Sequence, residues 1–267
     1  MTRFEPVLLP AHNPGPMTGS GNNTYLLTGR SGSATLIDAG VGEPRHLSDL
    51  GTALGSARLD AVLVTHGHRD HAAGAPAIAA AHPAASFSKM PWPDEDTQYS
   101  VPWRAIGDGD RLQAGDEWLS ALHTPGHSPD HIAFWHEPTS TIFTGDLVVQ
   151  NSSVMIHWSR GGDLGQYLAS LERLLALEPR RLLPAHGPAI DDPRTILTSY
   201  LEHRRSRERQ VLAALGAGYA TVETIAESIY DGLAAALVPA ARENVRAHLE
   251  KLKHEGRVVD ADGQWHL

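Results

Sequence analysis

One short segment carries most of the side chains that could bind a metal. Residues 65–71 read Thr-His-Gly-His-Arg-Asp-His and directly follow an apolar run at 61–64. Neutral imidazole and carboxylate groups are suitable ligands for zinc and similar first-row metals. Side chains that emerge where a strand turns into a loop can converge on one point. We therefore predict a metal site rather than a solvated, histidine-rich turn, with these candidate ligands: His66, His68, Asp70 and His71.

The composition narrows the chemistry that this site can perform. The 267 residues include 41% hydrophobic and 20% charged residues, as in an ordinary globular protein. The chain has no cysteine, which excludes disulfides, iron–sulfur clusters, thiolate zinc sites and cysteine nucleophiles. Any metal must therefore be held by His, Asp or Glu, and the 16 histidines are a large supply.

Charge and hydropathy indicate the partners and the location. The net charge of −9 gives no bulk attraction to nucleic acid, so an RNA substrate would need a local basic patch. No apolar run approaches the length of a membrane span. Residues 1–6 lack the charged start and apolar core of a signal peptide. We expect a cytoplasmic protein with no membrane partner.

The predicted strands and helices explain how distant polar residues could form one site. Strands are predicted at 4–9, 24–28, 34–37, 59–64, 118–122, 132–135, 141–144 and 181–183, and helices at 44–54, 72–81 and 164–175. Strands come first in pairs and then alternate with helices, which predicts an α/β protein with four αββα layers. Polar residues follow four of these strands: the 66–71 segment, His127, Asp146 and His186. Strand ends along one edge of a sheet pair can assemble a shared site.

Residues 89–104 contain Trp92, Trp103 and three prolines, and we predict an irregular excursion over the surface. A long ordered loop with exposed tryptophans is more often functional than accidental, which indicates a substrate lid. A packed linker is the alternative of equal weight.

A second unit is predicted from residue 193 onward. Asp192 and Pro193 form a cap and first-turn pair for a helix that reaches residue 215. Helices at 222–230 and 239–254 and a terminal hairpin follow, which is the winged-helix plan. We therefore predict a catalytic domain at 1–192 and a winged-helix domain at 193–267. From Tyr200 onward nine Lys and Arg stand against ten Asp and Glu, which favours a packing or dimerisation role over a grip on nucleic acid.

The ordered pattern of candidate ligands resembles that of the metallo-β-lactamase-fold hydrolases. The contexts Asp38-Ala39-Gly40 and Thr144-Gly145-Asp146 are similar as well. The loop at 13–18, the Asn23-Thr24-Tyr25 that follows and the winged helix narrow the resemblance. It is greatest to the β-lactamase-like proteins whose animal members are described as single-stranded RNA endonucleases, a pattern shared by certain polyketide-releasing thioesterases.

The resemblance implies two metal sites joined by one carboxylate. The first metal would be held by His66, His68 and His127, and the second by Asp70, His71 and His186, with Asp146 bridging both. Two Zn²⁺ ions are expected, with Mn²⁺ or Fe²⁺ as alternatives. Three or four protein ligands per zinc leave a position for water, and a water shared by two metals would be hydroxide near neutral pH.

Residues around the ligands also have predicted roles, and the resemblance implies those of Asp70 and Asn23. Asp70 would steer the proton of the nucleophile and is the predicted catalytic residue. His131 is expected to orient His127, and Asp38 to orient another ligand histidine, as groups behind metal ligands do. His123 is predicted to lie outside the ligand set. Asn23 is predicted to face the substrate or, with equal weight, to stabilise a turn.

We predict a dinuclear zinc hydrolase that attacks an ester, thioester or lactone of a small molecule through a metal-bridging hydroxide. The acidic composition favours such a substrate, whereas the resemblance favours single-stranded RNA as the alternative. A non-catalytic, metal-binding interaction module is the third hypothesis. The absence of cysteine ligands argues against β-lactam hydrolysis, and the winged helix argues against a glutathione thioester. A homo-oligomer is compatible with the sequence.

Overall fold

The first sheet contains six strands, each beside the next one in the chain. The computed structural model describes residues 4–16, 18–150 and 153–267, so residues 1–3 of the predicted N-terminus and Met17 of the predicted loop lie outside the described residues. The strands are β1 (Val7–Pro10), β2 (Asn23–Thr28), β3 (Ser33–Ile37), β4 (Arg58–Leu63), β5 (Ser86–Lys89) and β6 (Trp103–Ala105). Pairing is antiparallel from β1 to β3 and parallel from β3 to β6. Parallel neighbours require crossovers, which contain α1 (Pro44–Leu54), α2 (Arg69–Ala72), α3 (Ala75–Ala81) and α4 (Pro93–Asp96).

The second sheet has five strands in the order β11-β10-β9-β8-β7. They are β7 (Arg111–Ala114), β8 (Glu117–His123), β9 (Ile132–His136), β10 (Thr141–Gly145) and β11 (Arg181–Pro184). Only the β10–β11 pair is parallel among the described strands of this sheet, and α5 (Leu164–Ala176) lies in its crossover. Asp163 caps the N-terminus of α5, where its side chain accepts a hydrogen bond from the Gln166 amide.

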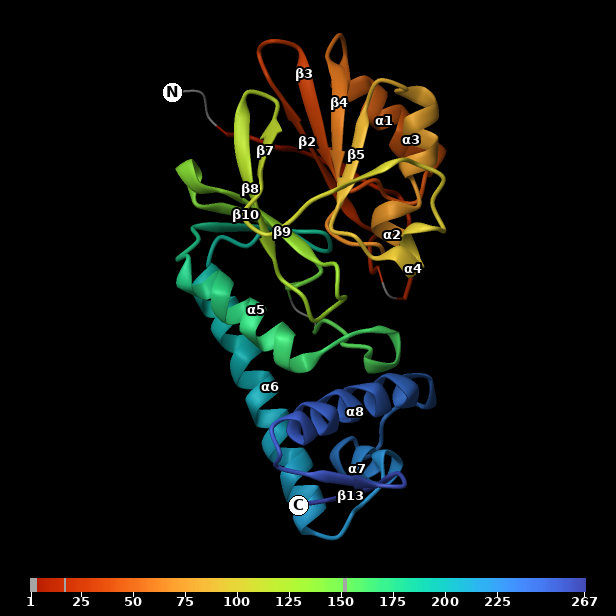
Figure 1. Ribbon diagram of the computed structural model, residues 1–267, viewed down its shortest axis with the longest axis vertical. Coiled ribbons are helices and arrows are strands. Elements are labelled where there is room, and N and C mark those ends of the chain that lie inside the picture. Colours follow the sequence, from red (N-terminus) through yellow and green to blue (C-terminus); the bar gives the residue numbers. More distant parts are fainter. Residues whose placement is uncertain (1–3, 17, 151–152) are drawn as a thin grey trace.

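Alternation of side chains along the strands builds three apolar layers. Tyr25 and Leu27 of β2 pack with Phe134 and Phe143 of the second sheet, whereas Leu26, one residue away, faces the helices outside the first sheet. α1 and α3 cover that outer face, and α5 and α6 cover the outer face of the second sheet (Figure 1). The predicted αββα arrangement is confirmed.

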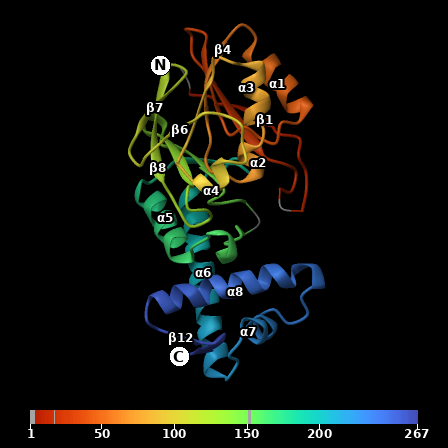
Figure 2. The same cartoon turned by 45° about the vertical axis from the view of Figure 1, so that its right-hand side comes forward.

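The C-terminal part is the predicted winged helix. It contains α6 (Pro193–Gly216), α7 (Val222–Ile229), α8 (Val238–His254), β12 (Val259–Ala261) and β13 (Gln264–His266). The α6 N-cap is Asp192, which accepts a hydrogen bond from the Thr195 amide. Leu197 and Leu201 of α6 belong to the core of the second sheet, whereas Val211 and Leu215 belong to the core with α7 and α8. One helix therefore runs through both units (Figure 2), and the division at 192/193 stays a prediction.

Two predicted segments differ from the structure. The helix predicted at 72–81 begins only at Ala75. Gly74 packs closely against the loop after β3, where a Cβ would lie 2.0 Å from the Ala39 carbonyl oxygen. Residues 69–72 form the separate turn α2. The excursion at 89–104 is partly regular, and Trp103 is half-buried in β6 against the outer core rather than exposed. None of the described helices is both long and apolar enough to span a bilayer.

Candidate metal centre

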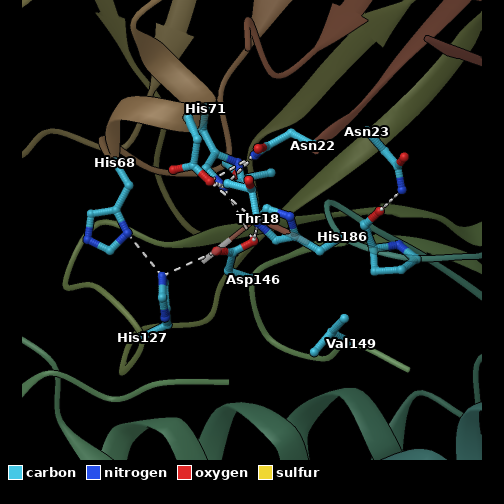
Figure 3. Close-up of polar contacts among 12 residues, drawn as sticks. Thr18, Asn22, Asn23, His68, His71, His127, Asp146, Val149 and His186 are labelled. Carbon is cyan, nitrogen blue, oxygen red and sulfur yellow. Dashed lines mark hydrogen bonds and ion pairs between the residues drawn. The ribbon is translucent and has the colours of Figure 1, made fainter. Parts of the chain in front are cut away.

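The structure brings all seven predicted ligands together at one edge of the two sheets. Figure 3 labels His68, His71, His127, Asp146 and His186 among them. The residues come from five places: the loop after β4, the turn α2, the β8–β9 loop, the end of β10 and the loop after β11. They form two groups whose ligand atoms lie within 4.8 Å of one another: His66, His68 and His127, and then Asp70, His71, Asp146 and His186. This division is the one implied by the resemblance.

The first group consists of three imidazoles whose nitrogen atoms converge. His68 Nδ1 lies 3.0 Å from His66 Nε2 and 3.0 Å from His127 Nε2. Ligand atoms bound tetrahedrally at the usual zinc distance lie about 3.3 Å apart, so this spacing fits a metal. Burial lowers the pKa of His68 to about 3, and burial also holds the pKa of His66 and His127 below the ordinary value. All three rings are therefore neutral, the form that can bind a metal ion.

The second group places two imidazoles against two carboxylates. His186 Nε2 lies 3.2 Å from Asp146 Oδ1 and 3.4 Å from Asp70 Oδ2. Burial lowers the pKa of His186, but Asp146 and Asp70 outweigh burial and raise it to about 9. Burial also lowers the pKa of His71, but the same two carboxylates outweigh burial and raise it well above the ordinary value. The two acids thus require positive charge between them, which protons or a divalent cation can supply.

Asp146 lies between the two groups and faces both. Its Oδ1 is 3.3 Å from His71 Nε2, whereas its Oδ2 is 3.5 Å from His127 Nε2. Oδ1 is buried and makes no hydrogen bond of acceptable geometry with any described residue. Burial raises the pKa of Asp146, but His71 and His186 hold it well below the ordinary value, so the group is anionic. An anionic carboxylate with one oxygen toward each group fits a bridge between two cations.

Two residues behind the ligands were expected to orient them, and one does so as predicted. Asp38 Oδ2 accepts a hydrogen bond from His71 Nδ1 at 2.9 Å and fixes the orientation of that ring. The prediction for His131 is wrong: its Nε2 accepts a hydrogen bond from the Asp146 amide at 3.1 Å. His127 is instead held by the carbonyl oxygen of Met155, 3.0 Å from its Nδ1. The reason is that His131 packs behind the end of β10, beside Gly145.

Asn22 is the residue of the centre that the sequence did not single out. Its Nδ2 donates to Asp70 Oδ2 at 3.0 Å, and its own position is fixed by two hydrogen bonds with the Asn13 side chain. The neighbouring Asn23 points away and donates to the carbonyl oxygens of Pro184 and Gly187, so its role is structural. Asn22 lies directly before β2 and Asn23 is its first residue, and successive side chains of an extended chain point to opposite sides.

Trp92 is the part of the 89–104 segment that lies next to the centre. Its ring centroid is 6.1 Å from that of His68, and its backbone amide donates to Asp96 in α4. A role of this segment as a lid stays a prediction. His123 lies outside the ligand groups, as predicted, with its Nε2 2.9 Å from the Pro129 carbonyl oxygen.

Two parts of the chain match known protein families. Residues 17–186 match the metallo-beta-lactamase superfamily, and residues 221–265 match the beta-lactamase associated winged helix domain. The chain belongs to the metallo-beta-lactamase superfamily. It is accordingly a metal-dependent hydrolase of this superfamily, with an appended winged helix.

Two relatives are similar in sequence over most of this chain. A beta-lactamase-like protein 2 homolog of Drosophila melanogaster is 30% identical, over 92% of this chain and 87% of its own. The lactamase-like protein aptB of Emericella nidulans is 36% identical over 76% of this chain, which spans 63% of that longer protein.

Solved structures share the fold of the whole chain or of most of it. A metallo-beta-lactamase family protein of Thermus thermophilus has a TM-score of 0.81 over 98% of both chains, at 23% identity. A second structure, of TTHA1623 in a di-iron-bound form, has a TM-score of 0.56 and 32% identity over 75% of this chain and 97% of its own.

Proposed function

We propose that this member of the superfamily is a dinuclear zinc-dependent hydrolase of a small-molecule ester, thioester or lactone. The observation that carries the proposal is the orientation of Asp146, whose two carboxylate oxygens face two separate groups of ligands. A single-metal site has no use for such a carboxylate. The similarity to a protein solved in a di-iron-bound form supports a pair of metals, although it does not favour zinc over iron.

The proposed ligands follow the two groups. His66, His68 and His127 would hold one Zn²⁺; Asp70, His71 and His186 would hold the other; Asp146 would bridge them. When bound, a pair of divalent cations lowers the pKa of water to near neutrality and polarises the bond to be cleaved. Mn²⁺ or Fe²⁺ would suit the same nitrogen and oxygen donors.

We propose Asp70 as the residue that steers a proton during the attack. Burial raises the pKa of Asp70, but His71, His186 and Asn22 overcome this effect and hold the pKa below the ordinary value, so the carboxylate is anionic and can accept a hydrogen bond from the nucleophile. The Asn22 amide donates to one of its oxygens and fixes the orientation of the carboxylate. Asp70 thus places an anionic hydrogen-bond acceptor beside the predicted metals.

The charge distribution favours a small substrate over RNA. The basic run at 204–209 is the one local feature that could attract RNA, but its first arginine is buried and its second pairs with Glu172 at 2.9 Å. The run therefore offers no continuous basic face. Single-stranded RNA remains the alternative substrate class, and a non-catalytic metal-binding module the second alternative.

Metal content and substrate range test the proposal together. Purified protein would be loaded with zinc, its metal counted by mass spectrometry, and its activity measured on p-nitrophenyl acetate, an acyl thioester, a lactone and a labelled unstructured RNA. We expect two metals per chain and turnover of one of the small molecules. Asp146→Asn, which conserves size, should lose metal and reduce activity by more than about 100-fold, since even groups behind metal ligands are worth 10–100-fold.

Asp262→Asn is the matched control, because Asp262 lies exposed in the turn of the terminal hairpin. It should keep both metals and full activity. One metal per chain would contradict the dinuclear site, cleavage of RNA alone would contradict the small-molecule substrate, and two metals without any turnover would favour the binding module.

A further inference from the structure

A cavity of about 250 Å³ lies where the winged helix meets the catalytic unit. It is bounded by residues 153–155 on one side and by α6, α8 and the chain between α7 and α8 on the other, and we call it the seam pocket. Its size is slightly below the roughly 300–1,000 Å³ of most small-molecule sites. The residues that matter for its chemistry are Val154, Arg204, Arg207, Leu233, Leu237 and Ala241.

The seam pocket contains two arginines without a carboxylate partner. Arg204 is only 2% exposed, and its guanidinium donates to the Asn244 side chain and to the Val154 carbonyl oxygen. Arg207 donates to Gln210 and stacks over the Tyr230 ring at 4.2 Å. Neither forms an ion pair with any described residue, and the lining includes no Asp or Glu. The Nε atoms of both are buried and lack a hydrogen-bond partner within the described ranges.

Three other basic residues of this unit do have carboxylate partners. Arg205 pairs with Glu172, while Lys251 and Arg257 both pair with Glu208. A buried charge without a counter-ion is costly, so an anion is expected beside Arg204. The neighbouring His248 supplies no further charge, because burial, and then Arg204 and Arg207, hold its pKa well below the ordinary value.

Most of the remaining lining surface is apolar. Val154, Leu233, Leu237 and Ala241 contribute it, alongside the polar groups of Ser153, His203, Tyr230 and Asn244, so a bare inorganic anion would leave the apolar part of the pocket unfilled. A guanidinium matches the geometry of a carboxylate through charged hydrogen bonds. We propose that the seam pocket binds a small organic acid, in which one carboxylate is joined to an apolar body.

The seam pocket is separate from the metal centre and shares one wall with it. None of the seven candidate ligands lines the pocket. The shared wall is residues 153–155: Arg204 holds the Val154 carbonyl oxygen from the pocket side, and His127 Nδ1 lies 3.0 Å from the Met155 carbonyl oxygen on the other. The proposal therefore goes beyond the proposed hydrolase function, and it stands whether or not two zinc ions are bound.

Calorimetric titration with octanoate tests this site on the full-length protein. Octanoate should bind saturably, one per chain, both to zinc-loaded protein and to protein treated with a chelator, and 1-octanol should bind far more weakly. Arg207→Gln should weaken octanoate binding by about 10- to 100-fold, the range of a charged hydrogen bond. Ala240→Leu, which adds volume at the half-buried rim, should weaken it as well.

The matched control is Arg209→Gln, which removes the same charge from an exposed position of α6 outside the pocket. Its affinity for octanoate should equal that of the unmodified chain, and thermal unfolding would establish that every variant is folded. Binding that requires metal and survives both pocket substitutions would place the carboxylate at the metal centre. That result, equal affinity for octanol, or no binding of octanoate would each overturn the proposal.

Discussion

Lys89 and Asp130 form an ion pair of 3.0 Å in which both side chains are completely buried. Asp130 Oδ2 also accepts a hydrogen bond of 2.7 Å from the Gly67 amide, which lies between two candidate ligands. Lys89 Nζ contacts Asp96 of α4 at 2.5 Å as well. One buried lysine thus connects the histidine loop with the helix that follows Trp92.

Breaking this ion pair should both destabilise the fold and loosen the metal loop. Asp130→Asn keeps the size of the side chain but removes one counter-ion of Lys89, and losing one partner of a buried pair costs about 3–5 kcal/mol. Urea unfolding would measure the loss, and chelator competition the affinity for zinc. Glu178→Gln breaks an exposed pair with Arg194 and should change neither quantity. An Asp130→Asn protein as stable as the parent would contradict the importance of the buried pair.

Asn22 should tighten metal binding through Asp70. Asn22→Ala removes the amide that donates to Asp70 Oδ2, and groups in such positions contribute about 10–100-fold to metal affinity. Competition with a chromogenic chelator would measure the affinity of both metals, and only the second should weaken, because Asn22 contacts residues of the second group. Gln98→Ala, at an exposed amide that donates to Glu95, serves as the control. Unchanged affinity in Asn22→Ala would leave Asn22 with a structural role only.

Replacing glycine by alanine should have opposite effects on stability at two positions. Gly74→Ala would place a methyl group 2.0 Å from the Ala39 carbonyl oxygen, so the turn that carries His71 must shift. We expect a loss of several kcal/mol, about 3 or more, together with weaker metal binding. Gly51→Ala, at an exposed position of α1 with no neighbouring atom within 4 Å, should instead stabilise by up to about 1 kcal/mol. Thermal denaturation of the pair would show whether both signs are correct.

His46 should make the protein sensitive to mild acid. Burial, and then the charge of His12, lower its pKa from 6.5 to about 4, while its Nε2 lies 2.9 Å from Thr24 Oγ1. In the unfolded chain His46 binds a proton more readily than in the folded one, so stability is lost as pH falls from 6.5 towards 4. The loss from this group is about 3 kcal/mol at the acid end.

Comparison with His46→Gln isolates the effect of His46 from that of the metal centre. The difference in unfolding free energy between the two proteins should change with pH between 6.5 and 4 and level off above 7. A difference that stays constant over this range would show that His46 does not titrate on unfolding.

The sequence was sufficient to predict which residues gather at this edge, because the candidate ligands follow recognisable strands. Apolar runs that end in His127, Asp146 and His186 identify both the strand and the edge at which it ends. Asn22 and Lys89 were missed because their partners, Asp70 and Asp130, are distant in the chain and no local pattern connects them. The same limit explains the error at His131. This residue is close to His127 in the sequence, but its hydrogen bond is to the more distant Asp146.

The 24-residue α6 has a consequence for how the chain holds together. Its first turns complete the core beneath α5, and its last turns complete the core around Trp265, over a span of about 36 Å. A fragment that ends at residue 192 would leave Leu171 and Leu174 open to water, and a fragment that begins there would carry an uncovered stripe of leucines. We therefore expect the hydrolase and the winged helix to melt as one cooperative unit, and an exchange of either between proteins to require this helix as well.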